Sequence, residues 1–269
     1  MRRLVTLILL LAMGTAAAQT VPFKLYDGYL IRVQCSAAGR PNLTAVIDTG
    51  VSETVIDLSL AKRLGLQLRS DKAVFVNKEA LVWAVTIPQV ELGPVAADSL
   101  DGIAANLSTL KGKLGVHPDL LIGMDLLHRS NFEIDYKARV LTFGTVPVLG
   151  HQAKLSPNER FAIVDSTISG RAVRLQVDTG LNGILLYTKR LAFNDRGLAG
   201  AHLMGVSETS AVQAADAEVR IGSWRSRGTA ISVLDTDPAA GYFDGLLGAR
   251  ALTSRRIAFD FRNEMVSWD

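Results

Sequence analysis

Two aspartates of this 269-residue chain stand in the same tripeptide, Asp48-Thr49-Gly50 and Asp178-Thr179-Gly180. Each tripeptide ends a β-like apolar run, so each aspartate is expected where a strand breaks into a tight loop. One such tripeptide alone would indicate only a turn, because Asp and Gly are common turn residues. Two carboxyl groups held close together, however, share one proton, and such a pair can act as general base and general acid on a water molecule.

The surroundings of the two tripeptides also repeat. The aspartates are 130 residues apart, and each tripeptide is followed by an apolar stretch and then by Lys-Arg-Leu. Downstream, Leu121-Ile122-Gly123 corresponds to Leu246-Leu247-Gly248, and an aspartate follows 12 residues after each of these glycines. Because these features come in the same order, the sequence predicts duplication of one structural unit.

The two copies also separate shared residues from incidental ones. Asp125 corresponds to Arg250 and is interpreted as an acidic residue in the first turn of a short helix, where it complements the helix dipole. Asp57 has no acidic counterpart and is interpreted as a helix cap or a surface group. Asp135 and Asp260 recur, but an aspartate flanked by aromatic residues is more typical of the end of a strand than of a catalyst. The three tryptophans, Trp83, Trp224 and Trp268, are expected in the core.

The first 18 residues have the pattern of a secretory signal peptide. Arg2 and Arg3 precede an apolar core, and Ala16-Ala17-Ala18 resembles a cleavage site. The apolar core is too short to span a bilayer, so we expect no stable membrane insertion after signal removal; an uncleaved anchor is the alternative. The sequence therefore predicts a periplasmic or secreted protein.

Composition excludes several classes of protein. Of the 29 basic side chains, the 27 that remain without Arg2 and Arg3 nearly balance the 26 acidic ones, which argues against nucleic acid as a partner. Cys35 is the only cysteine, so no intrachain disulfide can form. The four histidines lack the spacing of metal ligands, and no metal or other cofactor is expected.

The pattern along the chain predicts an all-β protein with short helices. A hairpin with strands at 29–36 and 43–47 leads to Asp48, and a second hairpin at 161–168 and 172–177 leads to Asp178. Frequent turn signals and β-branched strands favour two barrel-like lobes. Further strands are expected at 73–76, 81–92, 140–143, 217–221, 229–234 and 265–268, and short helices at 124–128 and 249–253. The expected organisation is a signal peptide at 1–18, an N-terminal lobe at 21–146, a linker at 147–158 and a C-terminal lobe at 159–269.

With the hairpin, the Asp-Thr-Gly loop and the apolar-apolar-Gly segment present once in each half, the chain resembles the retropepsin and pepsin-like aspartic proteases. The run that follows Asp48, DTGVSETVIDLSLAKRLGL, is most similar to bacterial retropepsin-like sequences. The resemblance implies two retropepsin-like lobes fused in one chain. It also implies a monomer in which the lobes form an intramolecular pseudo-dimer.

The resemblance also assigns roles to residues. Asp48 and Asp178 would be the catalytic pair of an aspartic endopeptidase that cleaves polypeptides without a cofactor. Thr49 and Thr179 would interlock the two loops by hydrogen bonds, and Gly50 and Gly180 would let the loops meet. The alternative is a retropepsin-fold protein with weak or no catalysis that binds extended peptides.

Two departures from the family pattern bear on activity. The family usually has Ser, Thr or Ala after the tripeptide, whereas Val51 and Leu181 stand here. Loss of a hydroxyl beside the carboxylates predicts a raised pKa of the pair and activity that extends nearer neutral pH. The second departure is the flap, the hairpin that covers substrate in this family, because its usual aromatic residue has no match. Residues 74–81 and 203–213 are flap candidates by position, and the sequence identifies no substrate-binding residues.

Overall fold

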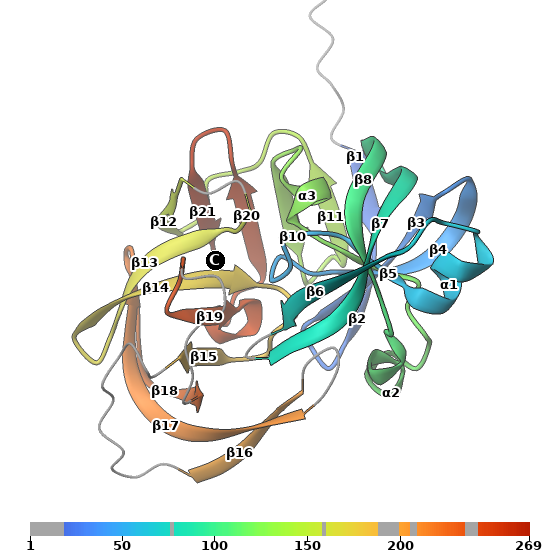
Figure 1. The fold of residues 1–269 in the computed structure, drawn as a ribbon. Helices are drawn as coiled ribbons and strands as arrows, with labels where there is room; N and C mark the ends of the chain where they lie inside the picture. The colour runs from blue at the N-terminus through green and yellow to red at the C-terminus, as the bar shows by residue number, and fades with distance from the viewer. Residues whose placement is uncertain (1–18, 76–77, 158–159, 188–198, 205–208, 235–241) are drawn as a thin grey trace, which may run out of the picture.

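The structure is a computed structural model that describes residues 19–75, 78–157, 160–187, 199–204, 209–234 and 242–269. Strands predominate in these residues, so the all-β prediction is confirmed. The helices are short: α1 (Leu58–Arg63), α2 (Lys111–Leu114), α3 (Met124–Leu127) and the 3-10 helices η1 (Ser108–Leu110) and η2 (Ala249–Leu252). Figure 1 shows the first half of the chain, in blue to green, beside the second half, in yellow to red.

The first half forms one sheet around the strand that leads to Asp48. Its order is β2-β3-β4-β9-β5-β8-β7-β6. The strands are β2 (Lys24–Tyr26), β3 (Leu30–Ala37), β4 (Arg40–Ile47), β5 (Val55–Asp57), β6 (Arg69–Phe75), β7 (Lys78–Leu92), β8 (Val95–Ala105) and β9 (Leu120–Ile122). The predicted hairpin before Asp48 is the pair β3 and β4.

The second half repeats this order with the strands numbered ten higher, as β12-β13-β14-β19-β15-β18-β17-β16. The strands are β12 (His151–Ser156), β13 (Ile163–Ile168), β14 (Arg171–Asp178), β15 (Ile184–Tyr187), β16 (Ala199–Met204), β17 (Thr209–Ile221), β18 (Trp224–Leu234) and β19 (Gly245–Gly248). In both halves the strand before the Asp-Thr-Gly loop pairs in parallel with the apolar strand β9 or β19. The two retropepsin-like lobes of the predicted fold therefore share one topology.

A further run of strands joins the two halves in the order β1-β11-β10-β20-β21-β12. The remaining members are β1 (Gln19–Pro22), β10 (Phe132–Asp135), β11 (Val140–Phe143), β20 (Arg256–Asp260) and β21 (Met265–Trp268). β10 of the first half pairs with β20 of the second. The predicted linker at 147–158 contains β12, where Ala153 and Leu155 are buried in alternation with more exposed neighbours, as in a half-buried strand.

The core runs through both halves. One connected cluster of buried apolar side chains extends from Val21 to Trp268, and Phe132 of β10 stacks on Phe259 of β20 with ring centroids 4.7 Å apart. Trp224 and Trp268 are buried and Trp83 packs partly buried against the same cluster, so the expected core role of the tryptophans is confirmed. Both Asp-Thr-Gly loops are therefore supported by one packed interior.

Candidate active site

The two Asp-Thr-Gly loops meet at the junction of the two halves. Asp48 follows β4, and its backbone N–H donates to the carbonyl oxygen of Ile122 at 3.0 Å, so β9 holds the loop from behind. Asp178 is the last residue of β14, beside β19. The predicted packing of the apolar-apolar-Gly segments behind the tripeptides is present in both halves.

Thr49 and Thr179 interlock the loops through four hydrogen bonds. Each backbone N–H donates to the other threonine's Oγ1, at 3.0 Å in both directions. The Thr49 hydroxyl donates to the carbonyl oxygen of Val177 at 2.8 Å, and the Thr179 hydroxyl donates to that of Ile47 at 3.1 Å. Both side chains are fully buried, so these hydrogen bonds lie away from water.

Glycine at the third position lets the carboxyl groups approach the opposite loop. A Cβ atom on Gly50 would lie 2.5 Å from Cγ of Asp178, and one on Gly180 would lie 2.9 Å from the carboxyl oxygens of Asp48. Neither distance is compatible with a side chain. Each aspartate therefore rests against the other half's glycine, and the two carboxyl groups are hydrogen-bonded to each other.

The two carboxyl groups are not electrostatically equivalent. Burial raises the pKa of Asp48, while the hydrogen bonds from the Gly50 N–H and from Asp178 act in the opposite direction. Burial and then the negative charge of Asp48 raise the pKa of Asp178 well above its ordinary value. The two carboxyl groups therefore share one proton and titrate as a coupled pair, with the larger rise in pKa at Asp178.

The raised pKa agrees in direction with the sequence prediction, but burial is its first cause. Val51 and Leu181 act in the loops through backbone groups: the Val51 carbonyl accepts from Met124 N at 3.0 Å, and the Leu181 N–H lowers the pKa of Asp178, against the effect of burial. Burial and then the charge of Asp178 raise the pKa of Tyr187, at the end of β15.

Gln176 is a site residue that the sequence reasoning missed. Its side chain is 1% exposed, and its Nε2 donates to the carbonyl oxygens of Thr49 at 3.2 Å and of Gly50 at 2.9 Å in the opposite half. The signal was present, because an amide interrupts the apolar run before Asp178 where the first repeat has Val46.

The aspartates interpreted as structural have structural partners. Asp125 lies in the first turn of α3 and also accepts from the N–H and the hydroxyl of Thr54, at 2.9 and 2.7 Å. Asp57 caps α1, which settles the choice between cap and surface group. Asp135 accepts from Ala138 N at 2.6 Å. Asp260 likewise accepts from Asn263 N at 3.1 Å, so both close turns at the ends of strands.

The flap candidates fall on matching hairpins of the two halves. Residues 74–81 cover the turn between β6 and β7, and residues 203–213 cover the turn between β16 and β17. Residues 76–77 and 205–208 of these candidates lie outside the described residues. The two candidates thus occupy corresponding positions in the repeated strand order.

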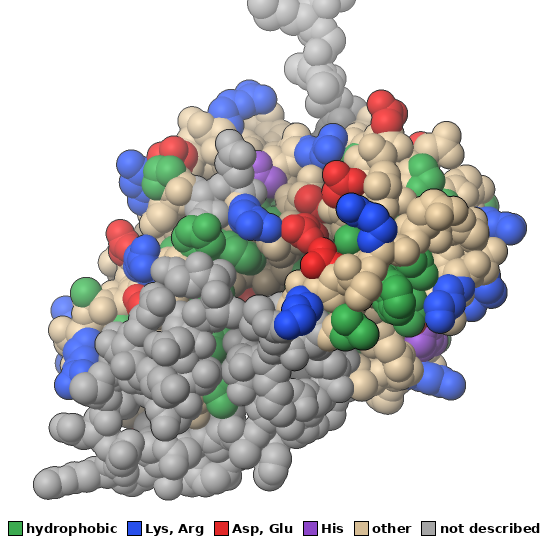
Figure 2. Space-filling view, in the orientation of Figure 1, with side chains coloured by type: hydrophobic (Ala, Val, Ile, Leu, Met, Phe, Trp, Pro, Cys, Tyr) green, Lys and Arg blue, Asp and Glu red, His purple; other side chains and the backbone are tan. Residues whose placement is uncertain are grey.

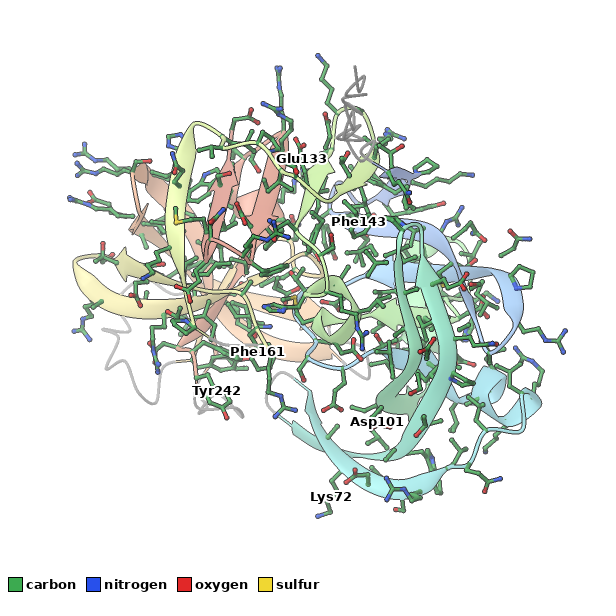
Figure 3. The ribbon with its side chains drawn as sticks, turned by 90° about the horizontal axis from the view of Figure 1, so that it is seen from above. Lys72, Asp101, Glu133, Phe143, Phe161 and Tyr242 are labelled. Atoms are coloured by element: carbon green, nitrogen blue, oxygen red, sulfur yellow. The ribbon has the colours of Figure 1, made fainter. Side chains whose placement is uncertain are left out.

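Acidic and aromatic side chains border the junction of the halves. Figure 2 shows acidic side chains close together there, and a pocket of about 550 Å³ in the first half is lined by Glu53, Asp71 and Asp101 among others. Arg160 reaches from the second half to Glu53 at 2.9 Å. In Figure 3, Asp101 and Lys72 of the first half lie on the same side of the molecule as Phe161 and Tyr242 of the second, opposite Glu133 and Phe143 of the joining strands.

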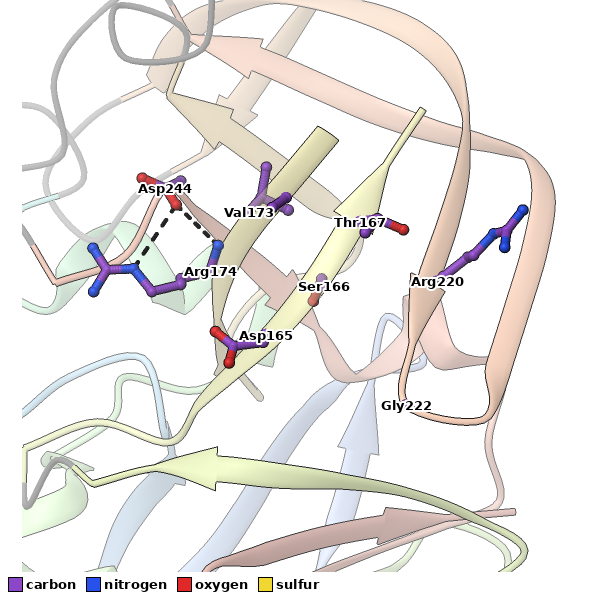
Figure 4. Close-up of a pocket in the computed structure, with 9 residues that line it drawn as sticks. Asp165, Ser166, Thr167, Val173, Arg174, Arg220, Gly222 and Asp244 are labelled. Atoms are coloured by element: carbon purple, nitrogen blue, oxygen red, sulfur yellow. Dashed lines mark hydrogen bonds and ion pairs between the residues drawn. The ribbon is translucent and has the colours of Figure 1, made fainter. Parts of the chain in front are cut away.

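A second pocket, of about 720 Å³, lies beside β13 and β14 (Figure 4). Within it the Arg174 N–H donates to Asp244 Oδ2 at 2.9 Å. The matching bond in the first half runs from Thr44 N to Asp119 Oδ2 at 2.8 Å. Because this bond recurs, Asp244 is a structural residue that fixes the start of β19, and the pocket is not assigned to the aspartate pair.

In the described part of the chain, no group of three or more His, Cys, Asp or Glu side chains is arranged to hold a metal ion. The helices described are also all too short or too polar to cross a membrane.

Comparison with known proteins finds the same resemblance. The model of the aspartyl protease family matches residues 33–126, from β3 to α3. Human Protein DDI1 homolog 1 is 24% identical over 147 residues, which are 53% of this chain and 34% of that protein. Mouse Protein DDI1 homolog 2 is 26% identical over 136 residues, 49% of this chain and 32% of that protein. The chain thus matches about a third of the length of these relatives, and its predicted resemblance to the retropepsin-like aspartic proteases is confirmed.

Proposed function

We propose that this protein is an aspartic endopeptidase in which Asp48 and Asp178, one from each half, cleave peptide bonds. The observation that carries the proposal is the hydrogen-bonded carboxyl pair, in which each carboxyl group lies against the opposite glycine. Thr49, Thr179, Gly50 and Gly180 support the pair as loop residues. The match to the aspartyl protease family supports the same reading.

The asymmetry of the pair suggests the order of proton transfers. Ionised Asp48 takes a proton from a water molecule, whose oxygen attacks the peptide carbonyl carbon. Protonated Asp178 donates its proton to the carbonyl oxygen. When the tetrahedral intermediate collapses, the C–N bond breaks and the proton held by Asp48 passes to the leaving nitrogen. One hydroxyl of the intermediate returns its proton to Asp178, which leaves a carboxylic acid product and restores the starting pair. No covalent enzyme intermediate is needed.

Peptide cleavage by single-residue variants tests this proposal. Asp48→Asn and Asp178→Asn each remove one proton carrier and keep the side-chain size, so we expect the cleavage rate of a peptide mixture to fall at least ~100-fold in each. Asp98→Asn changes an exposed aspartate of β8 in the same way and should cut like the parent. If both dyad variants cleave as fast as the parent, the shared-dyad mechanism is wrong.

The substrate of the proposed enzyme is an extended polypeptide that pairs with strand edges near the two hairpins. A peptide-binding protein with weak or no catalysis is the second candidate. It is favoured by Val51 and Leu181, which place no hydroxyl beside the carboxyl groups. One experiment distinguishes the two functions. A catalytically inactive binder would raise the fluorescence anisotropy of labelled peptides, and mass spectrometry would detect no peptide fragments.

We also propose that the protein is exported and acts as a monomer made of two duplicated lobes, 21–146 and 159–269. The basic and apolar start of the chain supports export. The repeated strand order supports duplication, and the meeting of both aspartates within one chain supports the monomer. Intact mass of the protein from cell fractions tests signal removal, and light scattering tests the oligomeric state.

A further inference from the structure

The amide of Gln176 reaches the site from the second half and acts on the loop of the first. Gln176 lies in β14 two residues before Asp178, and its Nε2 donates to the carbonyl oxygens of Thr49 and Gly50. The corresponding residue of the first half is Val46, which is 2% exposed and has no hydrogen-bonding side chain. Only the Asp48 loop can therefore receive such an amide at this position.

The contact is directed at the peptide group that supports Asp48. The Thr49 carbonyl and the Gly50 N–H belong to the same peptide unit, and this N–H donates to Asp48 Oδ1 at 2.9 Å. A hydrogen bond to a peptide carbonyl strengthens the donor at the other end of that peptide, because hydrogen bonds in a chain polarise one another. Gln176 Nε2, the Thr49–Gly50 peptide and the Asp48 carboxylate form such a chain.

We propose that Gln176 is a positioning residue that acts through the Thr49–Gly50 peptide to keep the negative charge on Asp48 rather than on Asp178. The role rests on the proposed function, in which ionised Asp48 is the base. The matching Gly180 N–H donates to Asp178 Oδ1 at 2.7 Å, but the residue that corresponds to Gln176 on that side is Val46. The single amide thus breaks the symmetry of two otherwise matching loops.

Few other groups compete for this role. Among the residues the structure describes, the ionisable groups that shift the pKa of either aspartate are the two carboxyl groups themselves, and the charge of Asp178 raises the pKa of Tyr187. Tyr187 is buried and neutral over the range in which carboxyl groups titrate. A change confined to Gln176 therefore alters the polarisation of the Asp48 loop without changing any charge.

The test compares Gln176→Met with Val46→Ala. Methionine has a similar length but cannot donate a hydrogen bond. We therefore expect the acid limb of the pH profile of kcat/KM to move to higher pH by about 0.5 to 1 unit. We expect kcat to fall about 5-fold or more, with KM within about twofold, because the loop acts on the base rather than on substrate binding. Val46→Ala removes buried volume at the corresponding position of the first half. It should lower the melting temperature and leave the acid limb of the pH profile unchanged. If Gln176→Met leaves the acid limb of the pH profile unchanged, Gln176 only packs against the loop and the proposal is wrong.

A second measurement uses the unmodified protein and needs no activity. The side-chain amide resonance of Gln176 should exchange slowly with water and should shift with pH at the apparent pKa of the aspartate pair, measured from ¹³C-labelled carboxyl groups. If the chemical shift of the Gln176 amide does not change as the aspartate pair titrates, the proposal is wrong. This result can be obtained even if Gln176→Met does not fold. If the parent cleaves no peptide, the proposed function fails, but the carboxyl titration still decides whether Gln176 acts on Asp48.

Discussion

At the scale of single residues, Thr49 and Thr179 link the two loops by four buried hydrogen bonds. Thr49→Val removes the hydroxyl that donates to Val177 and accepts from Thr179 N, and leaves both partners buried and unpaired. We expect the free energy of unfolding to fall by about 2 to 4 kcal/mol, since each unpaired buried group costs about 1 to 3 kcal/mol. Urea unfolding measures this.

The control for that variant is Thr86→Val, in which an exposed hydroxyl loses its 2.9 Å hydrogen bond to Asp101. Because water replaces the lost partner, stability should stay within about 0.5 kcal/mol of the parent. Equal effects of the two variants would mean that the crossed threonines add nothing beyond an ordinary surface contact.

The raised pKa values of the aspartate pair also predict how stability depends on pH. A carboxyl group whose pKa is higher in the folded than in the unfolded state favours folding most below the unfolded pKa, about 3.9, and this contribution is lost as pH rises through the folded pKa. Asp178→Asn removes the ionisation but can still accept from the Gly180 N–H. Its melting temperature relative to the parent should therefore increase from pH 4 to pH 8. A difference that does not vary with pH would contradict the raised pKa of Asp178.

The residues of the site could be predicted to the extent that their types recur. Asp48, Asp178, the threonines and the glycines stand in identical tripeptides, and the structure brings all six together. Gln176 could not be found by the rule that shared residues recur, because its contact exists on one side only. The same rule assigned Asp125 only a role in the helix dipole. It did not predict the hydrogen bonds that Asp125 accepts from Thr54, because Arg250 stands at the corresponding position of the second half.

At the scale of elements, helix α1 depends on one carboxylate. Asp57 accepts from the N–H groups of Ser59 at 3.0 Å and Leu60 at 3.2 Å, and its other oxygen lies 2.9 Å from Nε2 of His117. Burial would raise the pKa of Asp57, but the hydrogen bonds from Ser59, His117 and two backbone N–H groups outweigh burial and hold the pKa below its ordinary value. The carboxylate thus joins the start of α1 to the segment around His117.

Asp57→Ala should lower the free energy of unfolding by about 2 kcal/mol at pH 7, through loss of the cap and of the buried hydrogen bonds. Because the folded pKa is lowered, the stabilisation by Asp57 is present above the unfolded pKa and is lost as pH falls through the folded pKa. The gap between parent and variant should therefore narrow towards pH 2 in thermal unfolding. Asp98→Ala, at an exposed site of β8, provides the control.

Elements with strong local patterns were predictable, and those defined by their partners were not. The strands at 140–143 and 265–268 were predicted with their observed bounds, and both hairpins before the aspartates were found. β8 was missed because its buried positions are mostly Ala, Gly and Leu between Asp and Ser, a composition with low strand propensity. Its pairing with the long β7 decides its conformation. β12 was assigned to the linker because Pro147, Gly150 and Pro157 lie around it, whereas its pairing with β21, far along the sequence, decides its conformation.

At the scale of the whole molecule, the joining strands make the two halves one unit. β10 and β20 pair side by side, and the connected core includes side chains from both halves. The aspartates keep their positions only if the halves keep theirs, because each carboxyl group lies against a glycine of the other half. The aspartate pair therefore forms only in the assembled chain, and we expect the halves to unfold together.

Phe132→Ala tests this coupling at the centre of the joining strands. The ring is fully buried and stacks on Phe259, so its loss should lower the free energy of unfolding by about 3 to 5 kcal/mol. If the halves form one cooperative unit, calorimetry of parent and variant should each give a single transition that coincides with the changes in circular dichroism and tryptophan fluorescence. Val148→Ala, at a side chain that is 75% exposed, should leave the transition in place. Two separated transitions would show that the halves unfold independently, and the joining strands would then be too weak to hold the aspartate pair in register.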